Sequence, residues 1–268
     1  MRPRVPLPSG LVVAGGLLGA GFGLALGWLA AGALAGFGLL VAASAFYVVL
    51  FTQIRGTLEA LVERQRAVEE VFESTIRSLA AAIDARDAGA RDHASRVAHH
   101  AQAIARALGL PDADVRAVRL ASYLHDVGKI GVPDHLLRKP GPLTEEEWAA
   151  VRRQAVVAQD MLDPVQIDER VKLAVRHSHE RWDGSGYPDG LAGETIPVHA
   201  RILLVAEAYV AMTSDRPYRK AMAAPDAVAE LQRGAGRQFD RRIVDALVTV
   251  LEQEGATVWA LGPVGGHV

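Results

Sequence analysis

Residues 123 to 131, YLHDVGKIG, place ionisable side chains inside an apolar run. His125 follows Val118 by seven residues, so in a helix its imidazole points the same way as that apolar side chain. Asp126 comes next, and Lys129 lies three residues further on. A carboxylate in a dry interior is very costly unless a cation or a hydrogen-bond donor meets it. A divalent metal would meet both demands.

Two more ionisable residues stand on apolar helical stripes. His93 precedes Val97 by four residues, and Glu207 follows Leu203 by four. Because positions four apart lie on one helix face, both side chains are expected to point inward. The chain has no cysteine, so any metal must be held by imidazole and oxygen.

Each of these residues has a simpler explanation when it is taken alone. His93 is then a hydrogen-bonded core histidine, and Glu207 is a carboxylate paired with an arginine such as Arg201 or Arg216. Taken together with the adjacent His125 and Asp126, however, they indicate one metal centre with nitrogen and oxygen ligands.

A third histidine region precedes an irregular loop. His177 and His179 flank Ser178, and since side chains two apart diverge on a helix, at most one of the two histidines is expected to face a shared site. The following residues, ERWDGSGYPDG, contain three glycines and a proline together with Trp182 and Tyr187. Such a loop beside a metal suggests the wall of a ligand site, and the alternative is a plain surface turn.

These residues resemble the HD superfamily of metal-dependent phosphohydrolases. The stretches HDVGKIGVPD, HERWDGSGYPDGLAGE and TSDRPYRKA are similar to its HD-GYP branch, and the likeness spans roughly residues 73 to 250. The resemblance implies an all-helical bundle that hydrolyses cyclic di-GMP to linear pGpG or onward to GMP. It also implies two metals, commonly iron or manganese, and a place in bacterial second-messenger signalling.

The resemblance also implies roles for single residues. Asp126 would bridge the cations, and Lys129 would reach the scissile phosphate, where it steadies negative charge or protonates the departing ribose oxygen. Arg216 and Arg219 would grip the phosphates through forked hydrogen bonds. Tyr187 would shape the site or a partner surface without entering catalysis. Without the surrounding motif, Lys129 would be read as an exposed lysine at a helix end.

The sequence departs from the family pattern at the metal. Gln154 stands where the pattern has histidine, and Ser178 stands where it has the first of two adjacent histidines. Glu207 replaces a ligating aspartate, and Gly89 replaces the glutamate of three-metal members, so no third metal is expected.

The losses fall mainly on one of the two metal sites. His93, His125, Asp126 and Glu207 complete a single-metal site, whereas the second site keeps only His179 and a share of Asp126. Amide and hydroxyl oxygens do not replace imidazole for a transition metal. We therefore expect one occupied site, a doubtful second site and reduced or absent turnover, although the retained lysine and arginines favour binding of a phosphate ligand.

Three hypotheses follow from this pattern. The first is a cyclic di-GMP phosphodiesterase weakened at its second metal site. The second is a catalytically degenerate module that binds cyclic di-GMP or a partner protein and passes a signal on. The third is a one-metal HD phosphohydrolase that acts on another nucleotide.

The elements that must position these residues are helices, and the first of them are apolar. Residues 11 to 51 contain no charge, which at 1.5 Å per residue is about twice the length needed to cross a bilayer. We expect two transmembrane helices, near 11–30 and 33–53. Arg2, Arg4 and Arg55 then lie on one side, which the positive-inside rule makes cytoplasmic, together with residues 1–10. A cleaved signal peptide is the competing explanation.

The rest of the chain is expected to be cytoplasmic and all-α. A connecting helix over 54–79 carries Leu58, Leu61, Val68, Phe72 and Leu79 near heptad spacing. An HD-GYP-like domain is expected at 73–255 and a tail at 256–268. The heptads, and glycines at every fourth residue from 15 to 27, suggest a homodimer. The alternatives are an ordinary amphipathic helix for the heptads and a transmembrane hairpin packing on itself for the glycines. With 29 basic and 31 acidic side chains, no net charge favours a nucleic acid polymer as partner.

Overall fold

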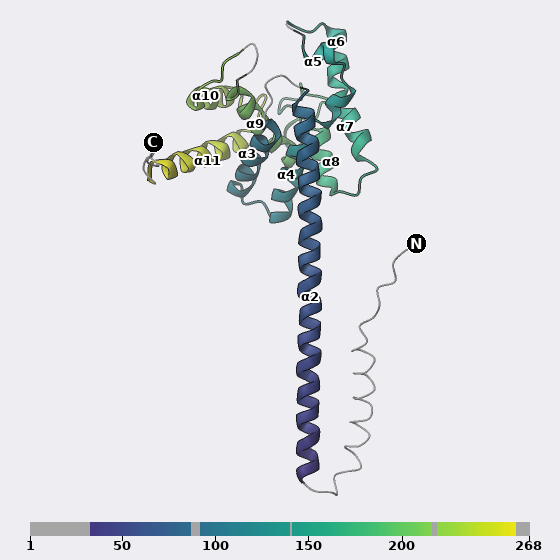
Figure 1. The fold of residues 1–268 in the computed structure, drawn as a ribbon. Coiled ribbons are helices and arrows are strands. Elements are labelled where there is room, and N and C mark those ends of the chain that lie inside the picture. Colours follow the sequence, from purple (N-terminus) through teal and green to yellow (C-terminus); the bar gives the residue numbers. More distant parts are fainter. Residues whose placement is uncertain (1–32, 87–91, 140, 216–218, 261–268) are drawn as a thin grey trace, which may run out of the picture. The chain divides into compact units, whose positions relative to one another are not determined.

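The computed structural model describes residues 33–86, 92–139, 141–215 and 219–260 (Figure 1). Over these ranges the regular elements are helices and no β-strand is formed, which confirms the all-α prediction. The predicted first transmembrane helix at 11–30, its glycine stripe, Gly89 and Arg216 lie outside the described residues. The chain divides into two compact units, Met1–Val71 and Phe72–Val268.

The first described element is α2, a helix of 52 residues from Ala33 to Asp84 (Figure 1). The predicted span at 33–53 and the predicted connecting helix at 54–79 form this one element. The reason is local, because residues 33–84 contain no proline and only isolated glycines, so nothing breaks the ladder of backbone hydrogen bonds.

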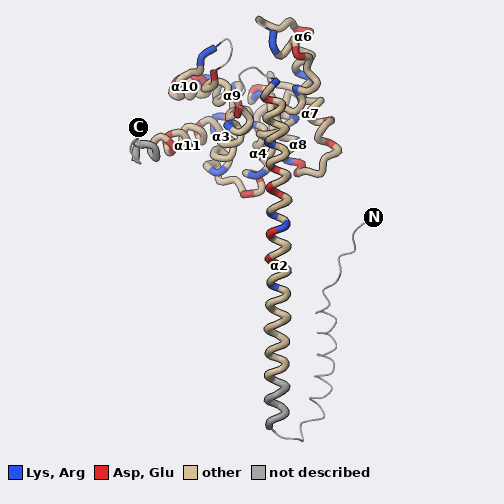
Figure 2. Tube along the Cα trace, in the orientation of Figure 1, with Lys and Arg blue, Asp and Glu red and all other residues tan. Residues whose placement is uncertain are grey.

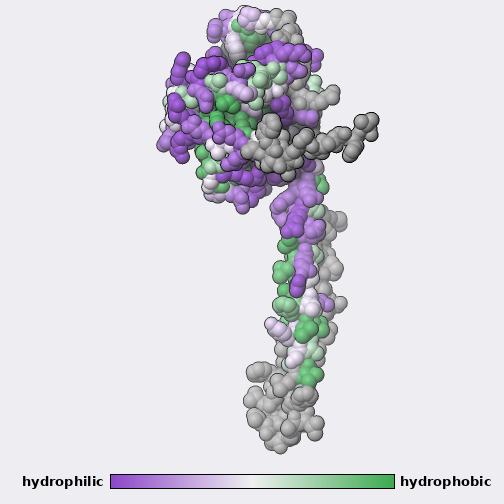
Figure 3. All heavy atoms as spheres, turned by 90° about the vertical axis from the view of Figure 1, so that its left-hand side faces the viewer, coloured by the Kyte–Doolittle hydropathy of each residue, from purple (hydrophilic) through white to green (hydrophobic). Residues whose placement is uncertain are grey.

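Residues 41–54 of α2 carry no charge and are mostly exposed. Val41, Tyr47, Val48 and Phe51 are each more than half exposed. In the sequence of α2 the first charged residue is Arg55, and Figure 2 shows the part of the tube before the first blue segment in tan or grey. Figure 3 shows the apolar colour recurring along the same helix. By length and composition, Val41–Asp84 is the one helical stretch among the described residues that could cross a membrane, and its most apolar part is not buried.

The second half of α2 carries one apolar stripe, which is buried only at its end. Ile76, Ala80 and Ile83, spaced by four and three residues, are buried in the second unit. The predicted heptad stripe adjoins them, because Ile76 lies three residues before its last member, Leu79, and Ile83 lies four residues after it. Leu79 is 41% exposed. The buried residues therefore anchor the end of α2, while the heptad positions beside and before them stay exposed.

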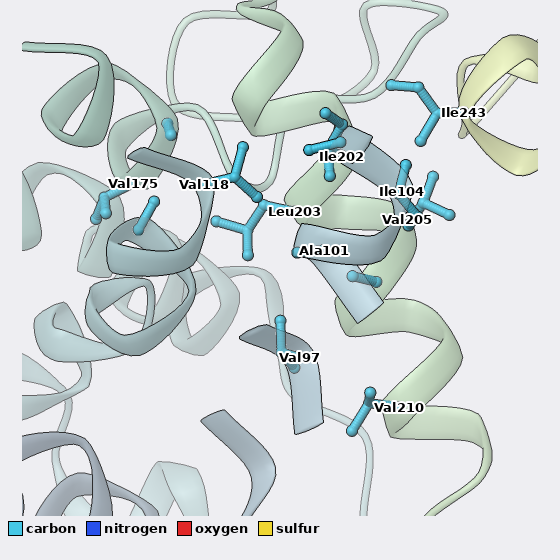
Figure 4. Packing of buried hydrophobic residues seen from close by; sticks show 14 of the residues in the cluster. Val97, Ala101, Ile104, Val118, Val175, Ile202, Leu203, Val205, Val210 and Ile243 are labelled. Carbon is cyan, nitrogen blue, oxygen red and sulfur yellow. The ribbon is translucent and has the colours of Figure 1, made fainter. Parts of the chain in front are cut away.

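The core of the second unit is a layered helical bundle. Its apolar side chains point toward one another from different helices, as Val97, Val118, Val175 and Leu203 do in Figure 4. The central elements are α3 (His93–Ala107), α4 (Asp112–Leu124), α8 (Glu169–Arg176) and α9 (Val198–Met212).

Shorter elements connect and cover this bundle. A capping box formed by Thr144 and Glu147 starts α6, where the two residues satisfy each other's backbone donors. The remaining elements are η1 (Val127–Gly131), α5 (Asp134–Leu137), α6 (Glu145–Arg152), α7 (Gln154–Leu162), η2 (Gly193–Thr195), α10 (Ala224–Gly234) and α11 (Arg241–Ala260).

Candidate metal centre

The histidine and aspartate at the end of α4 form the heart of the site. His125 caps α4, and its Nδ1 lies 2.7 Å from the backbone oxygen of Ser122. Because a carbonyl oxygen only accepts, Nδ1 carries a proton and Nε2 is the ring nitrogen left for a ligand. That Nε2 is buried, lies 3.4 Å from Asp126 Oδ2 and has no hydrogen-bond partner among the described residues. The imidazole is thus oriented as metal-binding histidines are.

Asp126 is buried between α4 and η1 and is paired on one side only. Its Oδ2 accepts a hydrogen bond from Lys129 Nζ at 2.7 Å, while its Oδ1 is buried without a partner among the described residues. Burial alone would raise the pKa of Asp126, but His125 and the Lys129 ammonium outweigh it and hold the pKa below its usual range. The carboxylate is therefore charged and has one oxygen left for a cation.

His93 completes a group of three. It is the first residue of α3, and its ring centroid lies 5.7 Å from that of His125. Burial, with the neighbouring His125, lowers the pKa of His93 to about 4, so its imidazole is neutral at pH 7. His93, His125 and Asp126 each offer a ligand atom, and these atoms lie within 4.8 Å of one another.

Glu207 is a neighbour of His93, His125 and Asp126 but is not one of the three residues whose ligand atoms lie within 4.8 Å of one another. Burial lowers the pKa of both His93 and His179, and the Glu207 charge partly opposes that lowering, so the half-buried carboxylate is an electrostatic neighbour of both imidazoles. The alternative pairing with Arg201 is wrong, because Arg201 Nη1 donates to Asp240 at 2.7 Å.

His179 faces Gln154 and Tyr187. Gln154 Nε2 lies 3.4 Å from His179 Nε2 and donates to the Tyr187 hydroxyl at 3.0 Å. The Tyr187 ring stacks on the His179 ring with centroids 4.9 Å apart. Burial lowers the pKa of His179 and raises the pKa of Tyr187 to about 12, so both groups are neutral at pH 7.

Two glycines allow these close approaches. A Cβ on Gly128, in η1, would lie 1.9 Å from the backbone oxygen of Gln154, so only glycine lets η1 pack against the start of α7. A Cβ on Gly186 would lie 2.6 Å from the backbone oxygen of His179. Backbone contact thus brings both Gln154 and Tyr187 to the centre.

A buried glutamate holds the loop that carries Tyr187. Glu180 is almost fully buried, and its two carboxylate oxygens accept from the backbone N–H groups of Asp189 at 2.7 Å and Leu191 at 3.1 Å. Trp182, expected in the wall of the site, instead packs over the Arg201 guanidinium, 5.7 Å from ring centroid to Cζ. Of the two loop aromatics, Tyr187 is the one in contact with a centre histidine.

The predicted phosphate-gripping residues are placed only in part. Arg219 is exposed and its Nη2 donates to the backbone oxygen of Ala211 at 2.6 Å. Arg216 lies outside the described residues. Their role stays a prediction.

Asp84, the last residue of α2, is a member of the site that sequence reasoning missed. It is buried, and its Oδ2 accepts from the backbone N–H of Ala94 at 3.2 Å. Burial raises its pKa, and the nearby Asp126 charge adds to the rise. Its position four residues after Ala80 is the same inward signal that identified the other ionisable residues. Asp84 ties the end of α2 to the first turn of α3, next to His93.

The arrangement suits a cation. Two imidazoles and a carboxylate converge, and a buried nitrogen and a buried oxygen lack hydrogen-bond partners among the described residues. Buried polar atoms without a partner cost free energy, and a bound cation would offset that cost.

The family model of the HD domain matches residues 77–243, which is more than half of the chain. The chain belongs to the HD domain family.

Curated proteins with named activities are similar to this chain. It is 44% identical over 193 residues to the cyclic di-GMP phosphodiesterase response regulator RpfG of Xanthomonas campestris, covering 71% of this chain and 51% of that protein. It is 33% identical over 184 residues to a 3'3'-cGAMP-specific phosphodiesterase of Vibrio cholerae, covering 68% and 35%. The chain thus spans about half or less of these relatives, and this homology confirms the HD-GYP resemblance.

Solved structures agree on the fold of this HD domain. A cyclic GMP-AMP specific phosphodiesterase of V. cholerae superposes with a TM-score of 0.53 at 17% identity, covering 66% of this chain and 48% of that one. At such identity the likeness shows the helical fold alone. HD phosphohydrolases are metal-dependent, which agrees with the partnerless ligand atoms at His125 and Asp126.

Proposed function

We propose that the chain hydrolyses a phosphodiester bond of cyclic di-GMP at the His93–His125–Asp126 centre. The carrying observation is the buried Nε2 of His125 and Oδ1 of Asp126, which have no partner among the described residues. A bound iron or manganese ion would supply Lewis acidity and a lowered pKa for an attacking water. We place Glu207 as the fourth ligand, since its charge already acts on His93.

Lys129 is the proposed acid of the reaction. Its ammonium lies 2.7 Å from Asp126 Oδ2, and its side chain is 20% exposed, so it stands between the buried centre and solvent. From there Nζ can stabilise charge on the scissile phosphate or donate a proton to the departing ribose oxygen. We assign Arg216 and Arg219 to the substrate phosphates and Tyr187 to the shape of the site.

The second metal position is proposed to be weak. Gln154 presents its amide nitrogen toward His179 Nε2, so a donor group points at the atom that would bind a cation. Ser178 is fully buried and its hydroxyl donates to the backbone oxygen of Val175 at 2.9 Å. Neither side chain is free to act as a ligand without giving up these contacts. We therefore expect turnover below that of a chain with histidines at both positions.

The contacts of Gln154 and Ser178 also support a second candidate function, a module that binds a cyclic dinucleotide without hydrolysing it. If the weak position prevents turnover, the centre could still hold a cyclic dinucleotide. The named activity of the V. cholerae relative makes 3'3'-cGAMP the second nucleotide to test.

The deciding experiment incubates the full chain with Mn²⁺ or Fe²⁺ and either cyclic dinucleotide, with products separated by chromatography. Asp126→Asn keeps the side-chain shape and removes the charge, so product formation should be lost. Asp226→Asn, an exposed site on α10, is the matched control and should leave the rate unchanged. Nucleotide binding without product supports the module, and product from 3'3'-cGAMP alone supports the other-nucleotide hypothesis. If the chain neither binds nor hydrolyses either nucleotide, the nucleotide assignment is refuted.

We further propose that the chain is anchored in the cytoplasmic membrane of a bacterium by two helices, with both ends of the pair in the cytoplasm. The exposed, uncharged residues 41–54 of α2 support a membrane span there. The chain has no cysteine, so single introduced cysteines report topology cleanly. Gly32→Cys should be labelled from outside the cell and Thr57→Cys should not. The reverse pattern, or labelling of neither in intact cells and both after lysis, would refute the hairpin.

The exposed heptad stripe on α2 supports a homodimer through this helix. Leu58, Leu61 and Val68 are each more than half exposed, as unpaired coiled-coil positions are. Disulfide crosslinking of a Leu61→Cys chain should give a dimer, and Glu63→Cys, on the opposite face of the helix, should give much less.

A further inference from the structure

A second group of metal-ligand side chains lies where α3 packs against α11. His99 and His100 of α3 and Glu254 of α11 each offer a ligand atom, and these atoms lie within 4.8 Å of one another. His99 Nε2 is 3.1 Å from Glu254 Oε1. None of the three takes part in the proposed hydrolysis.

His100 shows that this group is more than a surface ion pair. Its Nδ1 is buried and has no hydrogen-bond partner among the described residues. The ring packs edge-on against His99 and Tyr209, with centroids 5.1 and 5.0 Å away. Burial, with the adjacent His99, lowers the pKa of His100 to about 4, so the imidazole is neutral and can act as a ligand at pH 7.

An ion pair alone leaves this arrangement unexplained. The side chains of His99 and Glu254 are 64% and 43% exposed, and pairs this exposed to solvent contribute little to stability. Such a pair also leaves the buried nitrogen of His100 unsatisfied. Arg96, the nearest cation on α3, is occupied elsewhere, because its guanidinium donates to Ser214 Oγ at 2.7 Å.

We propose that His99, His100 and Glu254 bind a transition-metal dication, for which Zn²⁺ is the best fit. Two imidazoles and one carboxylate are ligands that Zn²⁺ takes in tetrahedral sites, with water in the fourth position, whereas Mg²⁺ and Ca²⁺ prefer oxygen alone. The bound ion would join the C-terminal part of α11 to α3. His100 lies seven residues after His93, about 10 Å along the helix, so this site is separate from the HD centre.

The first test is a Zn²⁺ titration of the full chain by calorimetry. His99→Gln and Glu254→Gln remove one ligand each from opposite helices and leave the HD centre intact. His135→Gln, an exposed histidine on α5, is the matched control. Wild type and the control should take up one equivalent of Zn²⁺ more than either variant, or bind it at least about tenfold more tightly. Equal uptake by all four proteins would overturn the proposal.

The second test reads the bridge between the helices. Zn²⁺ should slow amide hydrogen exchange in α11 near Glu254 in wild type and in His135→Gln, and should not do so in His99→Gln. Mg²⁺ should have no effect in any of them. If Zn²⁺ leaves the exchange of α11 unchanged in wild type, the bridging site does not exist. Neither readout uses cyclic di-GMP, so failure of the proposed hydrolysis leaves this result independent.

Discussion

The two sides of the HD centre differ in how their polar atoms are satisfied. On the His125–Asp126 side, a buried nitrogen and a buried oxygen have no partner among the described residues. On the other side, Gln154 bonds to Tyr187 and lies against His179. Unsatisfied buried groups cost free energy, so they mark the side where a bound ion is expected. On the Gln154 side, where the weak second metal position is proposed, the polar side chains bond to one another instead.

Removing an imidazole from the His125–Asp126 side should have the largest effect on activity. His125→Gln takes away the one ring whose tautomer is set by the Ser122 carbonyl, and we expect activity to fall by about 1,000-fold or more, as for loss of a central catalytic group. Metal content measured on the same sample should fall with it. Retained metal with lost activity would place His125 in another role, and would break the comparison between the two sides.

Gly128→Ala should push apart η1 and α7, the two elements that carry Gly128 and Gln154. The added Cβ would lie 1.9 Å from the backbone oxygen of Gln154, so η1 and α7 must move apart. We expect a loss of about 3 kcal/mol in the free energy of unfolding, measured with denaturant. Gly141→Ala, where a Cβ meets nothing within 4 Å, is the control and should change the stability little.

The pH dependence of the metal-free protein should reveal the buried imidazole at His93. Its pKa falls from 6.5 to about 4 on folding, because burial disfavours the charged form. Between those values the unfolded chain binds more protons than the folded chain, so stability is lost as the pH falls from 6.5 toward 4. The loss attributable to His93 is on the order of 3 kcal/mol.

Denaturant unfolding of wild type and His93→Gln at pH 7 and pH 4.5 measures this loss. The variant should be less sensitive to acid than wild type. An equal drop in both proteins would mean that the pKa of His93 is not lowered.

Placing histidine ligands on the Gln154 side of the centre should have the smallest effect on activity. Gln154→His exchanges an amide donor for a ligand, and we expect about a tenfold gain in activity with Mn²⁺, and a larger gain when Ser178→His is added. Gln154→Asn, which keeps the amide, is the control. No gain in either variant would show that the limit on turnover lies elsewhere. A gain accompanied by a second metal equivalent would show that these two positions separate the two sides.

Much of the site could be predicted because the helical repeat is local. A period of 3.6 residues decides which side of a helix His93 and His125 share with apolar neighbours, so their inward direction follows from spacing alone. The same reasoning applied to Asp84 would have found it. The long apolar run likewise indicated α2, although its continuity through residue 54 depended on the absence of any helix breaker.

The tertiary structure decided which partners those side chains meet. Arg201 was an available partner for Glu207 along the chain, yet it pairs with Asp240, 39 residues away. The contact of Gln154 with Tyr187 spans 33 residues and depends on the close packing that Gly128 permits. Amino-acid spacing determines direction within one helix, but which groups neutralise one another depends on how separate helices pack, and no local pattern encodes that.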